Sequence, residues 1–216
     1  MTETMGRATA RAPLEKISAL NAPLFQWILE QRSDSQRHVI LDLGAASTAM
    51  LSLLGQHPCH VQIADIASGR EIDRLNATPV GAELFSMAKA LLPEHCADQP
   101  VDTVLCWDLP NYLKPEAMTA LMAAIETRAA PGTIAHAFVV YSERSMPDRP
   151  RRYVPMQDGR LVNHATPSAE IAAPRYSPEA FGQLMGNFNI DRARLLANGM
   201  QEFLLRLEPL RPRAVS

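Results

Sequence analysis

The chain has 216 residues, of which 47% are hydrophobic, and its formal net charge is -2. This length suits a single domain that can bury a sizeable core, and a mean hydropathy of -0.10 is typical of a soluble globular protein. The near-neutral charge gives no reason to expect bulk attraction to nucleic acid or to an anionic membrane surface.

No apolar run is long enough to span a bilayer and no apolar core follows the first arginines, so we expect neither a membrane span nor a signal peptide, and a cytoplasmic location. The three cysteines, Cys59, Cys96 and Cys106, are odd in number and far apart. We therefore interpret them as small core residues in a reducing compartment. Neither CxxC nor HExxH spacing occurs, so no metal site is predicted.

The first 37 residues are expected to form a tail followed by covering helices. Residues 1–11 are small and polar and are expected to be disordered. Apolar side chains recur at near-helical spacing from Pro13 to Gln31, and Pro23 is expected to divide that stretch into two short helices. These helices would cover one face of a sheet.

The stretch His38–Asp65 has the pattern of a strand, a tight glycine turn, a helix and a second strand. The apolar run Val39–Leu41 leads to the turn at Gly44, and Val61–Ala64 leads to Asp65. In a right-handed βαβ unit, Gly44 and Asp65 lie side by side at the carboxyl edge of the sheet. Free N–H groups at the helix start attract an anion there, and an acid can accept two ribose hydroxyls.

Asp42-Leu43-Gly44 resembles the first motif of class I S-adenosylmethionine-dependent methyltransferases, Asp-x-Gly-x-Gly-x-Gly. Gly44 matches the first glycine, whereas Ala46 and Thr48 stand in the second and third glycine positions. An alanine methyl group limits how closely a ligand approaches the backbone. The acid two residues before the glycine favours this family over nicotinamide dehydrogenases. On this segment alone, a strand–turn–helix without a ligand is an equal alternative.

Between residues 66 and 100 the sequence predicts one helix, from about Gly81 to Leu92, ended by Pro93. The resemblance implies a third strand in this region, followed by an acidic residue near the adenine. No segment matches that expectation, so no adenine contact is assigned.

Val101–Trp107 is predicted to be a buried strand that leads directly into a polar loop, Asp108 to Tyr112. This segment resembles the fourth strand of the family and the loop beside the reactive methyl group. Asp108 and Asn111 would then bind the substrate or the cofactor ammonium, and Tyr112 would face the sulfonium. In the alternative, Asp108 and Asn111 organise a turn before the next helix. Tyr112 and Trp107 then pack in the core.

A helix is predicted over Pro115–Thr127 and a buried strand over Thr133–Tyr141, in which His136 is expected to be a hydrogen-bonded core or edge residue and not a catalyst. Residues 142–176 then form an insertion rich in proline and arginine. Two short strands flanking Gln157-Asp158-Gly159 predict a hairpin within it. Such a long loop is commonly a lid or binding element, or else is disordered.

The arginines of the insertion can recognise a carboxylate or phosphate on an acceptor. The alternative is a solvated basic loop whose charge is balanced by nearby acids.

The C-terminal part is predicted to contain a helix capped by Ser177 and a hairpin of two strands, Phe188–Ala197 and Met200–Leu207, joined at Asn198-Gly199. Phe203 and Leu205 should share one face of the last strand and Leu204 the other.

The resemblance covers about residues 38–207. It implies an α/β, Rossmann-like, doubly wound sheet of seven mostly parallel strands, with an antiparallel C-terminal strand and helices on both faces. We divide the chain into residues 1–37, a tail and covering helices; residues 38–208, a methyltransferase-like domain with the insertion at about 142–176; and residues 209–216, a C-terminal tail.

The leading hypothesis is an S-adenosylmethionine-dependent methyltransferase acting on a small or medium-sized acceptor, possibly an anionic one. A sulfonium methyl group is already activated, so such a site supplies proximity and alignment, and an acid such as Asp108 can act as a base. The resemblance implies that Asp108, Asn111 and Tyr112 act in catalysis. It implies that the cofactor contacts Asp42, Gly44, Ala45, Ala46, Asp65, Ile66, Trp107 and Asp108.

Two alternatives remain open. The missing glycines and the missing third strand motivate a catalytically inactive methyltransferase-like binding or assembly protein. A weaker alternative is a nucleotide- or dinucleotide-binding oxidoreductase, against which the incomplete G-x-G-x-x-G pattern and Asp42 both count.

Overall fold

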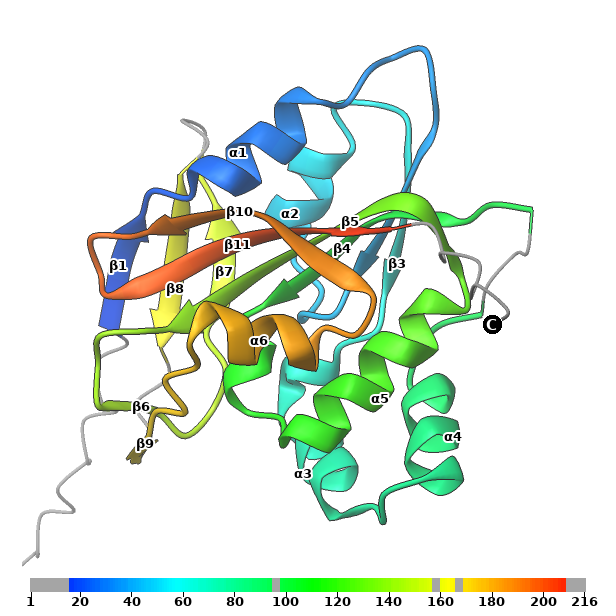
Figure 1. Cartoon of the computed structure of the whole chain (residues 1–216). Helices are drawn as coiled ribbons and strands as arrows, with labels where there is room; N and C mark the ends of the chain where they lie inside the picture. The colour runs from blue at the N-terminus through cyan, green and yellow to red at the C-terminus, as the bar shows by residue number, and fades with distance from the viewer. Residues whose placement is uncertain (1–15, 95–97, 157–159, 166–168, 209–216) are drawn as a thin grey trace, which may run out of the picture.

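The computed structural model describes residues 16–94, 98–156, 160–165 and 169–208. Its central sheet has six strands: β2 (His38–Asp42), β3 (Cys59–Ile63), β4 (Val101–Trp107), β5 (Ala129–Val140), β10 (Phe188–Leu195) and β11 (Met200–Leu207). They stand in the order β10-β11-β5-β4-β2-β3 (Figure 1). Strands β2 to β5 are parallel, and β11 is antiparallel to both of its neighbours, β5 and β10.

Several elements lie where the hydrophobic patterns place them. The strands predicted over Val101–Trp107 and Met200–Leu207 are confirmed at both ends. The predicted hairpin turn is confirmed, with Gly199 at φ +79° joining β10 to β11. The Ser177 cap is confirmed as well, since its hydroxyl accepts a hydrogen bond from Ala180 N at 3.1 Å.

The expected seventh strand is missing from the described chain. Residues 66–94 instead form a short 3-10 helix, η1 (Ile66–Ser68), and two α-helices, α3 (Arg70–Ala77) and α4 (Ala82–Ala90). The buried apolar side chains of α3, Ile72 and Leu75, are three residues apart with charged residues between them. That spacing suits a helix and not the alternation of a strand.

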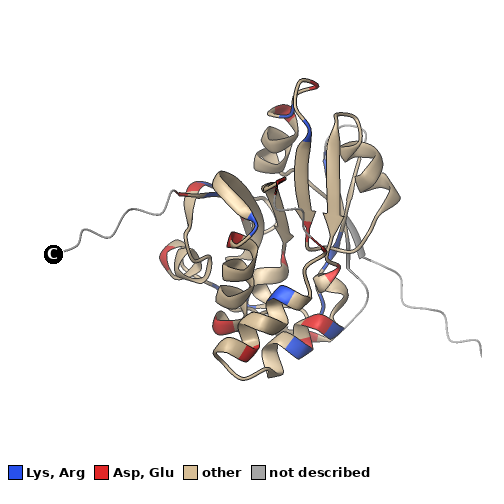
Figure 2. Cartoon of the chain, turned by 90° about the vertical axis from the view of Figure 1, so that its right-hand side faces the viewer, with Lys and Arg blue, Asp and Glu red and all other residues tan. Residues whose placement is uncertain are grey.

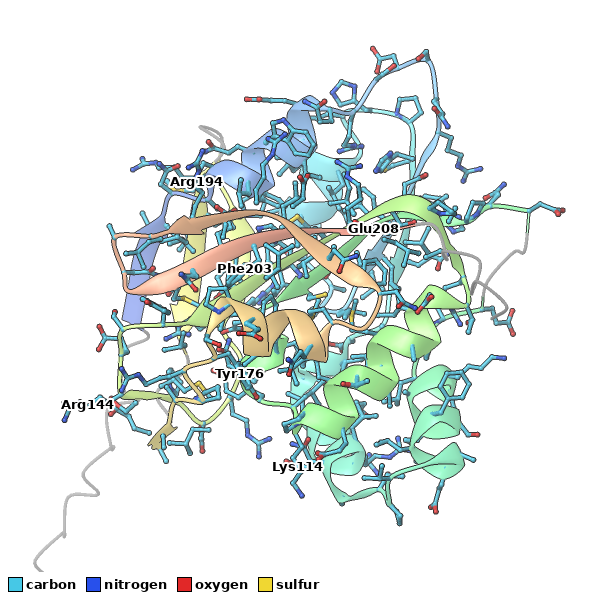
Figure 3. The ribbon with its side chains drawn as sticks, viewed as in Figure 1. Lys114, Arg144, Tyr176, Arg194, Phe203 and Glu208 are labelled. Atoms are coloured by element: carbon cyan, nitrogen blue, oxygen red, sulfur yellow. The ribbon has the colours of Figure 1, made fainter. Side chains whose placement is uncertain are left out.

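Helices cover both faces of the sheet (Figure 1). On one face lie α1 (Pro23–Glu30) and α2 (Thr48–Leu54), and on the other lie α3, α4, α5 (Pro115–Glu126) and α6 (Pro178–Leu184). Phe203 of β11, labelled in Figure 3, packs against Phe181 of α6 with ring centroids 4.6 Å apart. Leu204 faces the opposite side, as the alternation predicts.

A second, three-stranded antiparallel sheet covers the α1 and α2 face. The insertion supplies β7 (Arg152–Pro155) and β8 (Leu161–Ala165), and the N-terminal segment supplies β1 (Lys16–Leu20) along the other side of β8. The insertion hairpin is thus found, although its turn, residues 157–159, lies outside the described residues. The insertion also contains the pair β6 (Ser145–Pro147) and β9 (Glu170–Ala172).

The prediction of two N-terminal helices is wrong for the first of them, because residues 16–20 form β1. The second helix is found as α1. The backbone of β8 offers an edge whose N–H and C=O groups need partners, and this pairing overrides the near-helical apolar spacing. The predicted tails at residues 1–11 and 209–216 lie outside the described residues, as does Cys96.

Acidic and basic residues are interspersed along the helices in the lower part of Figure 2. Within the described ranges, no helix is long and apolar enough to cross a membrane. The same ranges contain no group of three or more His, Cys, Asp or Glu side chains able to hold a metal ion.

Candidate functional site

The glycine turn after β2 is built around the buried carboxylate of Asp42. Its Oδ1 accepts hydrogen bonds from Gly44 N at 2.8 Å and from Trp107 Nε1 at 2.6 Å. Burial raises the pKa of Asp42, and these two hydrogen bonds oppose the rise. A Cβ at position 44 would lie 2.8 Å from the Trp107 ring. Glycine is therefore required here by the closeness of the indole.

Trp107, the last residue of β4, has a left-handed backbone with φ +52°. A bulky side chain rarely adopts this conformation, which costs about 1–2 kcal/mol. Only 4% of the residue is exposed, and its ring stacks on Tyr153 with centroids 5.3 Å apart and planes at 12°. The indole therefore fills the space between the glycine turn and the insertion.

Asp65 follows β3 at the same edge of the sheet. Because Asp42 pairs with Ile63, Gly44 and Asp65 each follow their strand by two residues. The Asp65 side chain is exposed and makes no hydrogen bond or ion pair with the part of the chain that the structure describes. Partial desolvation and the charge of Glu71 raise its pKa. This carboxylate is available to accept hydrogen bonds from a ligand.

Three further predicted cofactor contacts differ in their access to a ligand. Ala45 and Ala46 are exposed at the glycine turn, so their backbone can be approached from outside. The Ile66 side chain is fully buried in the core beneath η1. Only the backbone of Ile66 can contact a ligand.

Asp108, immediately after β4, lies under the insertion and is 0% exposed. Its Oδ2 accepts hydrogen bonds from Arg151 N at 3.1 Å and from Arg151 Nη1 at 3.4 Å. Its Oδ1 and the Tyr153 hydroxyl have no hydrogen-bond partner of good geometry among the described residues. Burial raises the pKa of Asp108 to about 6, although the Arg151 cation opposes the rise.

Asn111 and Tyr112 organise their surroundings in the manner of the alternative interpretation. Asn111 Nδ2 donates to the carbonyls of Asp108 and Phe138, at 2.8 and 2.9 Å, and its Oδ1 accepts from Val140 N at 2.8 Å. Tyr112 Oη donates to the Arg149 carbonyl at 2.9 Å, and burial raises its pKa. Neither side chain is free for a substrate while these bonds hold.

The part of the insertion that lies over this edge is residues Asp148–Tyr153, which we call the covering segment. Beyond the contacts with Asp108 and Tyr112, it reaches α3, where Arg149 Nη1 lies 3.4 Å from both the Gly69 carbonyl and Asp73 Oδ2. The cavity that remains beside Gly44 has a volume of about 60 Å³. Pockets for small molecules usually have volumes of about 300 Å³ or more. The space beside Gly44 is therefore largely filled by the chain itself, although Asp65, Ala45 and Ala46 remain exposed at the same edge.

The sequence pointed to the insertion arginines but not to their partners. Arg149 and Arg151 are neutralised by Asp73 and Asp108, which lie 76 and 43 residues away along the chain. Arg152 is exposed and lines the mouth of the small cavity. The arginine-rich composition was the available signal, and only the tertiary fold shows which cation remains free for an anion.

We expect Asp108 to make the stability of the protein depend on pH. Its carboxyl holds a proton to about pH 6 in the folded chain, against an ordinary pKa of 3.8. Its contribution to stability is therefore fully present below about pH 4 and is lost as the pH rises to about 6, a change of about 3 kcal/mol. Asp108→Asn cannot titrate, so its denaturation curves between pH 4 and 7 should change less than those of the wild type. Asp98→Asn, at an exposed site, is the control, and parallel wild-type and Asp108→Asn profiles would contradict the assignment.

No protein-family model matches the chain, and no curated protein matches it in sequence. Solved structures do resemble it. The PH0226 protein from Pyrococcus horikoshii OT3 is 13% identical with a TM-score of 0.50, over 86% of this chain and 88% of that chain. At this identity the likeness concerns the fold alone, an α/β fold with a mixed central sheet and helices.

Two other solved structures that resemble the chain are methyltransferases. Burkholderia thailandensis 1,6-didemethyltoxoflavin-N1-methyltransferase, with S-adenosylhomocysteine bound, is 15% identical with a TM-score of 0.46, over 86% of this chain and 77% of that chain. The glycopeptide N-methyltransferase MtfA, complexed with S-adenosylmethionine, is 17% identical with a TM-score of 0.43, over 85% of this chain and 92% of that chain.

Proposed function

We propose that this chain is an S-adenosylmethionine-dependent methyltransferase that acts on a small or medium-sized acceptor. The observation that carries the proposal is the shared carboxyl edge of β2 and β3. There the glycine turn and the exposed carboxylate of Asp65 follow two hydrogen-bonded parallel strands at equal distances. In open α/β sheets this edge is where nucleosides bind, and an acid at the end of the second strand suits the two ribose hydroxyls.

The polar groups of this edge fit the cofactor. The space beside Gly44 is too small for it while Trp107 and the covering segment hold their present positions. Asp65 would accept the ribose hydroxyls, and the exposed backbone at Ala45 and Ala46 would face the methionine part. When bound, the cofactor supplies an activated methyl group. The protein would contribute proximity and alignment. The cavity of about 60 Å³ beside Gly44 requires the edge to open first.

For the acceptor we propose an anionic group near Arg152. This side chain is exposed at the mouth of the small cavity, and none of the described acids forms an ion pair with it. Arginine binds carboxylates and phosphates through two parallel hydrogen bonds. Arg149 and Arg151 already have acidic partners and contribute less to such recognition.

A second candidate function is favoured by Trp107. Its indole donates to Asp42 and lies against Gly44, in the place where a cofactor would approach the turn. A protein in which this arrangement is permanent would be a methyltransferase-like binding or assembly module without methyl-transfer activity.

Calorimetric titration with S-adenosylmethionine, S-adenosylhomocysteine and NADH separates these functions. We expect micromolar binding of the first two and none of the third. Asp65→Ala should weaken binding about 10- to 100-fold, because hydrogen bonds to a charged group contribute about 1.5–3 kcal/mol. Glu83→Ala, which removes an exposed acid on α4, should leave the affinity unchanged.

Unchanged affinity in Asp65→Ala would overturn the ribose assignment. If neither S-adenosylmethionine nor S-adenosylhomocysteine binds, even to the variants with an opened edge described below, the inactive module is the better conclusion.

A further inference from the structure

We propose that Trp107 and the covering segment form an autoinhibitory latch that must open before a ligand as large as the cofactor can fit beside Gly44. The proposal rests on the proposed function, since it concerns the same edge of the sheet. It adds that the chain itself competes with the cofactor, and it names the side chains that do so.

The first observation is the position of the Trp107 ring. It contacts the glycine turn on one side, where a single added Cβ would meet it at 2.8 Å, and it stacks on Tyr153 of the covering segment on the other. The left-handed backbone at φ +52° is a strained conformation for this residue. Backbone strain of this kind persists where the surrounding contacts impose it, and it often marks a switch. Here the ring is held by Asp42, by Tyr153 of the covering segment, and by Phe25 and Phe138 of the core.

The second observation is that polar contacts fasten the covering segment to separate elements. Arg151 bonds to Asp108 after β4 through both its backbone and its guanidinium. The Arg149 guanidinium forms an ion pair with Asp73 of α3, and the Arg149 carbonyl accepts a hydrogen bond from the Tyr112 hydroxyl. These contacts are directional, so they fix one placement of the segment over the edge.

The third observation is that the contact between the covering segment and α3 lies at the surface, whereas the contact between Arg151 and Asp108 is buried. The Arg149 and Asp73 side chains are 51% and 69% exposed, and ion pairs at such exposure contribute little. The Tyr153 hydroxyl interacts with Asp108 beneath the covering segment, but neither it nor Asp108 Oδ1 has a well-formed hydrogen bond among the described residues, so opening would offer both groups water as a partner. We propose that breaking this surface contact is the first step of opening, so that the latch exchanges between a closed and an open state. Its closed fraction lowers the apparent affinity for a ligand in proportion to the population that is open.

Tryptophan fluorescence reports on this latch without any enzyme assay. The chain has two tryptophans, so Trp27→Phe leaves Trp107 as the single reporter. In that background we expect weak quenching of Trp107 by acrylamide, since the ring is buried, and stronger quenching once saturating S-adenosylmethionine is added.

Two variants open the latch by different means. Tyr153→Ala removes the stacked ring, and Arg149→Ala removes an exposed ion pair without touching the core, so at least the second will fold. Both should increase acrylamide quenching of Trp107. They should bind S-adenosylmethionine more tightly, by about tenfold for Tyr153→Ala and about threefold for Arg149→Ala. Arg144→Ala is the matched control, because Arg144 is exposed near the start of the same insertion (Figure 3) and its side chain makes no hydrogen bond or ion pair with the glycine turn, Asp108 or α3.

The outcomes separate the latch from the proposed function. Increased quenching with tighter binding supports both. Increased quenching with wild-type affinity overturns the latch and leaves the function standing. Quenching that matches Arg144→Ala in both variants also overturns the latch. Increased quenching with no binding of S-adenosylmethionine by any protein overturns the proposed function, and with it the role of the latch as a gate.

Discussion

Replacing Glu202 with alanine is expected to lower the free energy of unfolding by about 4 kcal/mol, because it removes one partner of a buried charged network. Glu202 lies on β11 and is 0% exposed. Its carboxylate accepts hydrogen bonds from Leu24 N at 3.0 Å and Phe25 N at 2.8 Å, and it lies 2.9 Å from His136 Nε2. The first turn of α1 has no side-chain cap of its own, since Ala22 precedes it. A strand residue far along the chain therefore caps this helix.

Urea denaturation measures the loss as a lower midpoint with an unchanged slope. Glu202→Gln should cost about 2 kcal/mol, because an amide keeps one acceptor but points a donor at the other backbone N–H. Gln201→Ala, one residue earlier on β11, is the control, since its Oε1 has no partner among the described residues. Amide exchange at Leu24 and Phe25 should quicken in Glu202→Ala alone. A midpoint equal to that of Gln201→Ala would contradict the capping role.

The strands of the sheet could be predicted because their patterns are local. Val101–Trp107 is an almost continuous apolar run, which suits a parallel strand covered on both faces, and it forms β4. The Asn-Gly pair at residues 198–199 requires left-handed backbone, which fixed the final hairpin. His136 is expected from the sequence to be a hydrogen-bonded core or edge residue, and its burial and its contact with Glu202 show that it is a core residue.

Other elements could not be predicted because their partners are remote in sequence. Residues 16–20 are a strand only because β8, about 145 residues later, offers them an edge. The cap of α1 comes from Glu202, and no local pattern near residue 22 reports it. The seven-stranded plan came from the resemblance, and the helical spacing within Arg70–Ala77 is the physical reason that the extra strand is missing.

At the candidate site, chain order predicted that Gly44 and Asp65 share one edge of the sheet but could not show which side chains occupy the space between them. The position of Gly44 beside the strand that ends before Asp65 follows from chain order in a βαβ unit. The rotation of the Trp107 ring into that space depends on Tyr153 and Asp42, which lie 46 residues later and 65 residues earlier in the chain. Side-chain competition for a site is decided by tertiary packing, which no local pattern encodes.

Replacing Trp107 with a small residue is expected to move stability and ligand affinity in opposite directions. Trp107→Ala should lower the free energy of unfolding by about 3 kcal/mol, since it empties a packed aromatic site between Phe25, Phe138 and Tyr153. The same change removes the ring that contacts Gly44 and should strengthen binding of S-adenosylmethionine at least as much as Tyr153→Ala. If Trp107 only packed the core, its replacement would lower both the free energy of unfolding and the affinity for S-adenosylmethionine.

Trp107→Gly makes the prediction sharper, because the backbone at this position is left-handed with φ +52°. Glycine in place of alanine normally costs about 0.5–1 kcal/mol, but relief of left-handed strain returns about 1–2 kcal/mol. The glycine variant should therefore be the more stable of the two, by about 0.5–1 kcal/mol on this balance, while binding the cofactor equally well.

Trp27→Ala is the control, since Trp27 packs under the Arg192 guanidinium on the outside of α1 and not at the turn. A glycine variant less stable than the alanine variant would contradict the strain at Trp107. Unchanged affinity in both would show that the indole does not stand in the path of the cofactor.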